Sequence, residues 1–297
     1  MSQAKTSPLA FIALLIGSSA LAFGPWLVRE AGVGPVAAGF WRLALALPFL
    51  FLIALVTGDP VRWPRRNLIV LIMLAGFFFA ADLAAWHTGI HMTKLANATL
   101  FGNISSFAFA AWGLWLARRL PSPAQAAALL LAALGAALLM GSSAELSPRN
   151  LRGDLLAMIA GLLYTGYLIA VERARGDLAP LPLLFLASVF GAAMLLPFSL
   201  LLGERVMPSD WTPVLLLALG SQVLGQGLLV YAIGALPPLV VGLALLSQPA
   251  ISAVIGWFAY HEGLSTLDWL GAAAIALALV LVRLPERGLR APQCQPN

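Results

Sequence analysis

The chain has 297 residues, of which 61% are hydrophobic and only 10% are charged, and its net charge is +5. Soluble globular domains carry about 25% charged residues, so this composition excludes a soluble domain and predicts an integral membrane protein that uses the lipid bilayer as its solvent. The basic balance does not indicate nucleic-acid binding, because the cations lie in short breaks between apolar runs, where they control topology.

Ten apolar stretches follow one another along the chain, each close to the roughly 20 residues that a membrane-spanning helix needs. We expect spans at Leu9–Val28, Val36–Val56, Leu68–Ile90, Asn97–Ala117, Pro123–Gly141, Leu155–Val171, Leu181–Gly203, Pro213–Leu236, Leu239–Tyr260 and Leu267–Val282. Because the apolar residues run continuously instead of alternating, they predict helices and not a β-barrel. The predicted fold class is all-α integral membrane.

The Lys and Arg residues in the breaks predict the orientation of the spans. One side collects Lys5, Arg62, Arg65, Arg66, Arg118, Arg119, Arg173, Arg175, Arg283, Arg287 and Arg290. The other side collects Arg29, Lys94, Arg149, Arg152 and Arg205. Since cytoplasmic loops carry the excess of Lys and Arg, we predict a multi-pass protein of a bacterial-type cytoplasmic (inner) membrane with both termini in the cytoplasm.

An internal repeat divides the chain into two halves. When the chain is shifted by 145 residues without gaps, Gly89 falls on Gly234 and Trp112 falls on Trp257. The third to fifth spans then overlay the eighth to tenth, so each half holds five helices. An odd number per half gives the halves opposite orientations, as in many secondary transporters. We therefore predict two inverted five-helix repeats (5+5), over residues 1–145 and over residues 146–297, the second including a short C-terminal tail.

Local patterns in three spans resemble the EamA family of the drug/metabolite transporter superfamily. The second predicted span begins near Pro35 and contains Arg42, similar to the proline and arginine of the family. The last two spans and the break between them contain Pro249, Glu262 and Gly271, which resemble the family's Pro…Glu…Gly signature. The resemblance implies an exporter of amino acids or other metabolites, a class that includes YddG-like exporters.

The first half departs from this signature. Its matching positions are Ile104, Ala117 and Ala126, so the signature is intact only in the second half. The departure bears on the symmetry of the two halves and not on the family resemblance, which covers nearly the whole chain.

An ionisable residue inside a predicted span costs several kcal/mol and marks a functional candidate, and Arg42 and Asp82 are the clearest cases. Arg42 is six residues from the outer start of the second span, and Asp82 is eight residues from the outer end of the third. At 1.5 Å per residue both lie about 9–12 Å inside the same edge, so we expect them to face the bundle interior, where they can pair. Two roles stay open: an ion pair that only fixes helix packing, and a role in substrate or proton handling.

An amino-acid substrate needs hydrogen-bonding partners for its ammonium and carboxylate groups in an otherwise apolar chamber. We expect the chamber to be lined by Arg42, Phe78, Asp82, Trp86, Asn103, Tyr164, Gln222, Gln226, Gln248 and Pro249. The aromatic rings can stack on a substrate ring, and Pro249 frees a backbone carbonyl that can accept a hydrogen bond. The alternatives are an interfacial belt for the tryptophans and helix–helix contacts for the small polar residues.

Residues for other chemistries are sparse. The single cysteine, Cys294, excludes an intrachain disulfide, and His87 with His91 has the spacing of a zinc pair without a further ligand nearby in the sequence. The motifs G-x-x-x-x-G-K-[ST], H-E-x-x-H and G-x-S-x-G are absent. We therefore predict no enzyme, no metal and no other cofactor.

The inverted halves predict a secondary transporter that works by alternating access through a central cavity. The family resemblance implies that it exports amino acids (aromatic or neutral) or related small metabolites. A proton is the candidate coupling ion, and we expect a monomer. The alternative is an intramembrane enzyme that acts on a lipid-linked substrate.

Overall fold

The computed structural model describes residues 7–93, 95–118, 120–141, 148, 150–260 and 265–282, and these contain helices and connecting segments but no strand. The first half holds α1 (Pro8–Ala22), α2 (Gly24–Glu30), α3 (Pro35–Ala44), α4 (Leu47–Val56), α5 (Arg66–Met92), α6 (Leu95–Gly102), α7 (Ile104–Leu116) and α8 (Pro123–Gly141). The second half holds α9 (Leu151–Ala174), α10 (Pro180–Leu201), α11 (Thr212–Leu216), the π-helix η1 (Leu217–Gln226), α12 (Gly227–Ile233), α13 (Pro238–Leu245), α14 (Ser247–Tyr260) and α15 (Thr266–Leu281). The predicted all-α class is confirmed.

Among the described residues, six helical segments are long and apolar enough to cross a membrane. They are Pro8–Glu30, Pro35–Val56, Arg66–Met92, Leu151–Ala174, Pro180–Leu201 and Thr212–Ile233. Shorter apolar helices lie at Ile104–Leu116, Pro123–Leu138, Pro238–Ile251 and Thr266–Leu281. Six predicted spans are thus confirmed as long apolar helices, and the total of ten crossings stays a prediction.

Prolines explain three of the breaks between consecutive helices. Pro25 follows the break between α1 and α2, Pro48 follows the break between α3 and α4, and Pro249 follows the break between α13 and α14. A proline lacks the N–H that would continue the helix, and its ring crowds the carbonyl four residues earlier. The break between α6 and α7 falls instead at Asn103, without a proline in the adjacent turns.

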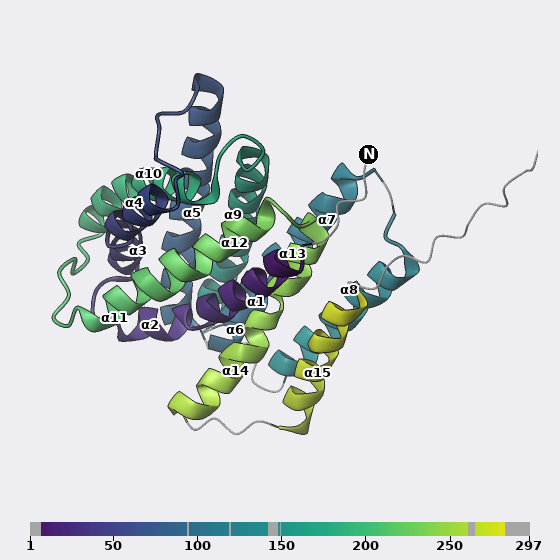
Figure 1. The fold of residues 1–297 in the computed structure, drawn as a ribbon. Helices are drawn as coiled ribbons and strands as arrows, with labels where there is room; N and C mark the ends of the chain where they lie inside the picture. The colour runs from purple at the N-terminus through teal and green to yellow at the C-terminus, as the bar shows by residue number, and fades with distance from the viewer. Residues whose placement is uncertain are drawn as a thin grey trace, which may run out of the picture.

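The centre of the bundle is built on α5, which packs along α9 and α10, while α3 packs against α5 and α10 (Figure 1). Close approach of α9 to the α6–α7 break depends on Gly161. A Cβ added there would lie 2.7 Å from the Gly102 carbonyl oxygen and 2.5 Å from Ile104 Cγ2. Small residues permit such backbone contacts between membrane helices.

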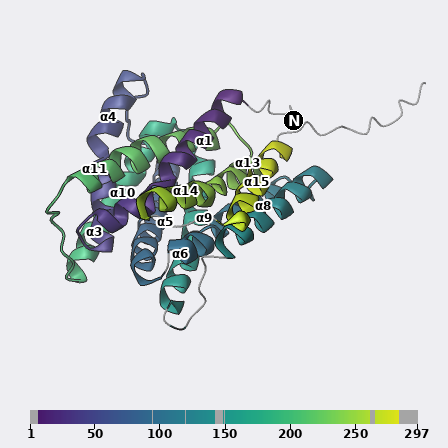
Figure 2. The same cartoon turned by 90° about the horizontal axis from the view of Figure 1, so that it is seen from below.

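The helices α8 and α15 pack side by side as a pair at one side of the bundle, and the two views agree on this arrangement (Figures 1 and 2). Gly135 of α8 faces Gly271 of α15, and a Cβ added at Gly135 would lie 2.7 Å from the Gly271 carbonyl oxygen. The glycine of the family signature therefore lies at a close contact between two helices.

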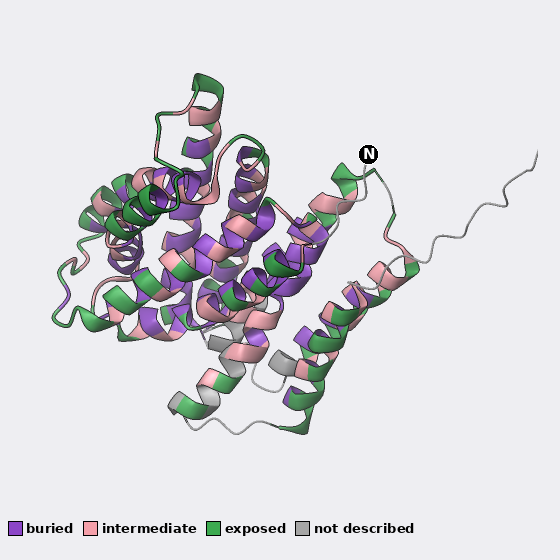
Figure 3. Cartoon of the chain, in the orientation of Figure 1, coloured by how far each residue is buried: buried purple, intermediate pink, exposed green. Residues whose placement is uncertain are grey.

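The outer surface of the bundle is apolar, as expected for a protein surrounded by lipid. Buried residues occupy the inward faces of the helices, and exposed residues lie on the outer faces (Figure 3). Large apolar side chains are among the exposed ones, including Val56 at 88% and Leu201 at 84% exposure. Arg42, Asp82 and Gln222, by contrast, are buried, so a few polar side chains lie inside a bundle that is otherwise mostly apolar.

Candidate substrate-binding site

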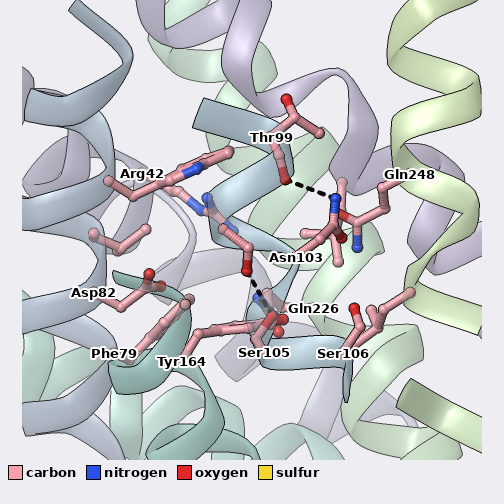
Figure 4. Close-up of a pocket in the computed structure, with 16 residues that line it drawn as sticks. Arg42, Phe79, Asp82, Thr99, Asn103, Ser105, Ser106, Tyr164, Gln226 and Gln248 are labelled. Atoms are coloured by element: carbon pink, nitrogen blue, oxygen red, sulfur yellow. Dashed lines mark hydrogen bonds between the residues drawn. The ribbon is translucent and has the colours of Figure 1, made fainter. Parts of the chain in front are cut away.

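A cavity of about 80 Å³ lies inside the bundle (Figure 4). One water molecule needs about 10–15 Å³ of such space, so several water-sized groups fit. Residues from both halves of the chain line it: Leu21, Arg42, Phe79, Asp82, Leu83, Trp86, Thr99, Gly102, Asn103, Ser105, Ser106, Gly161, Tyr164, Gln226, Leu245 and Gln248. The helices that contribute are α1, α3, α5, α6, α7, α9, η1, α13 and α14, together with Asn103 between α6 and α7.

The structure brings most of the predicted site residues to this cavity. The predicted residues that line it are Arg42, Asp82, Trp86, Asn103, Tyr164, Gln226 and Gln248. Three others, Phe78, Gln222 and Pro249, lie outside its lining. Pro249 is buried next to Gln248 in the first turn of α14, and the other two have specific packing roles.

One face of α5 supplies a wall of the cavity. Phe79, Asp82, Leu83 and Trp86 share this face because residues three and four apart lie on the same side of a helix. Phe78 is one position off this face, and its ring covers Gly166 of α9, where an added Cβ would lie 2.9 Å from Phe78 Cδ1. Periodicity counted from Asp82 allows both Phe78, four residues earlier, and Phe79, three residues earlier. Periodicity counted from Trp86 favours Phe79, because seven residues make nearly two full turns.

Arg42 is held by a chain of buried side chains. Its Nε donates a hydrogen bond to Gln222 Oε1 at 3.1 Å, and Gln222 Nε2 donates to Ser188 Oγ at 3.0 Å. The guanidinium carbon lies 5.6 Å from the ring centre of Phe79, within range of a cation–π interaction. Gln222 therefore lies behind Arg42 and contacts the cavity only through it.

Asp82 lines the same cavity but does not contact Arg42 directly. Within the described part of the chain, no salt bridge joins the two residues, and no hydrogen bond engages the Asp82 carboxylate. The direct pairing that the sequence allowed is replaced by the Arg42–Gln222 hydrogen bond. Asp82 is only 7% exposed, and buried carboxylates normally have hydrogen-bond partners. The geometry therefore leaves this carboxylate available to the cavity.

A tyrosine–glutamine cluster closes another part of the wall. Gln226 Nε2 donates to Tyr164 Oη at 3.1 Å, and Tyr167 Oη donates to Gln226 Oε1 at 3.4 Å. The Tyr167 ring stacks on Phe79 with ring centres 4.4 Å apart. Gln226 lies at the end of η1, a segment with i→i+5 hydrogen bonds, and π-helical segments are frequent at functional sites.

The α6–α7 break supplies neutral polar groups. Asn103 Nδ2 donates to the Thr99 carbonyl at 2.7 Å, and Ser105 Oγ donates to the Gly102 carbonyl at 3.0 Å. Ser106 is 1% exposed, and its hydroxyl has no hydrogen-bond partner within the described residues. In Figure 4, Arg42 and Asp82 lie on one side of the view, and Ser106 and Gln248 lie on the other.

His87, His91, Pro249 and Gly271 are not among the residues that line this cavity. His87 is buried, with Nδ1 3.0 Å from the Pro35 carbonyl oxygen, and His91 is exposed. No group of three or more His, Cys, Asp and Glu residues suited to a metal occurs in the part of the chain that the structure describes. Glu262 lies outside the described residues.

A model of the EamA-like transporter family matches residues 4–141 and 151–284. The chain belongs to this family. This EamA-like protein is therefore a membrane transporter and not an enzyme, which confirms the resemblance and sets aside the intramembrane-enzyme alternative. The six long apolar helices agree with a multi-pass protein of the inner membrane.

Curated relatives match most of this EamA-like chain. The threonine/homoserine exporter RhtA of Escherichia coli (strain K12) is 26% identical over 276 residues, which are 91% of this chain and 90% of the relative. RhtA of Salmonella typhimurium (strain SL1344) is 26% identical over 272 residues, with 91% and 90% coverage. A solved chain, described as a crystal structure of a protein, has a TM-score of 0.77 at 17% identity over 95% of this chain and 99% of its own length. The last likeness shows a shared fold.

Proposed function

We propose that this protein exports amino acids or related small metabolites across the inner membrane and that the cavity around Arg42 and Asp82 is its substrate site. The family and the two threonine/homoserine exporters support export of this substrate class. The observation that carries the proposal is Asp82, a buried carboxylate without a protein partner among the described residues, in a polar cavity that also contains Arg42.

An unpaired charge inside a span is costly, so proteins keep it where it serves a substrate or an ion. The cavity offers a cation, an anion, amides and hydroxyls to one small ligand. The small volume fits a ligand with few non-hydrogen atoms, such as threonine, better than one with an indole ring. Neutral amino acids with short side chains are therefore the preferred substrates within the predicted class.

The transport mechanism that we propose is alternating access between two inverted five-helix repeats, residues 1–145 and 146–297. The two separate segments matched by the family model support this division. Both halves contribute residues to the cavity, as expected where a substrate site lies between repeats. In this arrangement both termini lie in the cytoplasm, and a monomer contains one complete site.

Asp82 is also the residue that we propose to carry a coupling proton. The ionisable groups that interact with it electrostatically are Arg42, Tyr164 and Tyr167. A carboxylate that alternates between a proton and a substrate ammonium would couple entry of one to exit of the other. Replacement by asparagine removes the proton site and keeps the shape of the side chain.

The test is efflux from proteoliposomes that contain the purified protein and one labelled amino acid at a time. The wild type should release threonine faster than empty liposomes, and a proton gradient directed into the lumen should accelerate release. Asp82→Asn should abolish this acceleration. Ser18→Ala, which changes a buried hydroxyl outside the cavity lining, should leave release unchanged. Absence of protein-dependent release for all twenty amino acids, with and without the gradient, would overturn the proposal.

A further inference from the structure

The guanidinium of Arg42 has one occupied edge and one free edge. Its Nε is engaged by Gln222 Oε1, and its face lies toward the Phe79 ring. The terminal nitrogens make no hydrogen bond to any described residue, although Arg42 is 3% exposed and lines the cavity. A guanidinium presents parallel N–H groups that match the two oxygens of a carboxylate. The free edge therefore suits a carboxylate ligand.

Asp82 offers the complementary chemistry from α5. An ionised carboxylate only accepts hydrogen bonds, so its natural partner in an apolar interior is a cation with several N–H donors. Arg42 could supply one but is held away by Gln222, and no salt bridge joins the two charges within the described residues. A cation and an anion that line one cavity without joining each other match a ligand that carries both charges.

Gln222 determines where the Arg42 side chain lies. Gln222 and Ser188 are both 0% exposed, so their hydrogen bonds do not compete with water. Since Gln222 Nε2 donates to Ser188 Oγ, its Oε1 is directed toward Arg42. The two hydrogen bonds connect η1 and α10 to the guanidinium on α3. Gln222 thus acts on a ligand through Arg42 and not by direct contact.

We propose that the cavity binds the head group of an α-amino acid as a zwitterion, with its carboxylate on the free edge of Arg42 and its ammonium at Asp82, and that Gln222 is a positioning residue for Arg42. The inference rests on the proposed function and deepens it. It excludes ligands that lack either charge, such as amino-acid amides and hydroxy acids, from tight binding at this site.

The experiment measures inhibition of labelled-threonine transport in proteoliposomes by three unlabelled compounds. Threonine carries both charges, threonine amide lacks the carboxylate, and 2,3-dihydroxybutyrate lacks the ammonium. Wild-type protein should prefer threonine over each analogue by at least about tenfold, because loss of a charge partner leaves its buried counterpart unpaired. If threonine amide inhibits as strongly as threonine, the proposed contact between Arg42 and the carboxylate is wrong. If 2,3-dihydroxybutyrate inhibits as strongly as threonine, the proposed contact between Asp82 and the ammonium is wrong.

Substitutions test the ammonium contact and the carboxylate contact of the ligand separately. Asp82→Asn should remove the preference over the hydroxy acid and keep the preference over the amide, and Arg42→Gln should do the reverse. Gln222→Leu should raise the KM for threonine about fivefold with little change in Vmax and should weaken the preference over the amide alone, because only the carboxylate end is disturbed. Gln222→Glu retains an acceptor for Arg42 Nε but places a second carboxylate beside the guanidinium, so it should weaken the preference over the amide and leave the preference over the hydroxy acid unchanged.

Ser18→Ala is the control for substitution inside the bundle, and each variant is compared with the wild type by melting temperature in detergent. If wild-type protein transports threonine but Gln222→Leu lowers Vmax and the preferences over both analogues together, the positioning role is wrong while the proposed function stands. If the wild type transports no amino acid, the proposed function itself fails. If Arg42→Gln does not fold, two other results still test whether Arg42 binds the ligand carboxylate. They are the wild-type preference for threonine over threonine amide and the effects of Gln222→Leu and Gln222→Glu on that preference.

Discussion

The carboxylate of Glu204 accepts a hydrogen bond from the backbone nitrogen of Ala37 at 2.8 Å and a second one from Val36 at 3.2 Å. Glu204 follows α10, and the two amides belong to the first turn of α3. A carboxylate at this position satisfies amides that have no partner within the helix and interacts favourably with the helix dipole. The contact anchors the helix that carries Arg42.

Glu204→Ala should therefore destabilise the protein by about 1–2 kcal/mol, the usual cost of losing a helix cap with a charged acceptor. The melting temperature in detergent should fall, and the KM for threonine should rise because α3 loses its anchor. Asp177→Ala removes an exposed carboxylate and should change neither value. An unchanged melting temperature for Glu204→Ala would show that the cap contributes nothing.

Gly135→Ala should destabilise the contact between α8 and α15. The added Cβ would lie 2.7 Å from the Gly271 carbonyl oxygen, and overpacking of this kind costs about 1–3 kcal/mol. Gly220→Ala is the matched control, because nothing lies within 4 Å of a Cβ added there. Thermal unfolding of both variants in the same detergent measures the difference, and equal melting temperatures would contradict the observed helix contact.

Ser106→Ala should reduce the selectivity of transport for hydroxylated side chains. The buried hydroxyl has no partner among the described residues, so it is available to a ligand hydroxyl, and such a hydrogen bond contributes about 0.5–1.5 kcal/mol. The preference for threonine over 2-aminobutyrate, which lacks the hydroxyl, should fall about threefold to tenfold. A variant that keeps the wild-type ratio would place the substrate hydroxyl elsewhere.

Cys294 reports on topology without any introduced residue, because the chain has a single cysteine. If both termini are cytoplasmic, a membrane-impermeant maleimide should leave Cys294 unlabelled in intact cells and label it after lysis. Ser209→Cys in a Cys294→Ser background should show the opposite pattern, since Ser209 is exposed between α10 and α11 on the predicted outer side. Labelling of Cys294 in intact cells would refute the cytoplasmic placement of the C-terminus.

Sequence patterns predicted those site residues that stand out by their type within a single apolar helix. Asp82 and Arg42 stand out as ionisable residues within apolar runs, and the structure places both at the cavity. Gln222 and Gln226 are one turn apart in sequence, yet only Gln226 lines the cavity. The two glutamines share a face of η1 but lie one turn apart along its axis, so Gln222 meets Arg42 and Ser188 while Gln226 meets the cavity. Which turn of the helix meets the cavity depends on the neighbouring helices, and the sequence contains no simple signal for it.

The sequence by itself determined that this protein is an α-helical membrane transporter, because the length of apolar runs and the family pattern are properties of the chain read in order. Only the tertiary structure decided which side chains share the cavity, that Arg42 is held by Gln222 and that Asp82 is left without a protein partner among the described residues. The rotation of each helix about its axis depends on the neighbours against which it packs, and those neighbours come from distant parts of the chain.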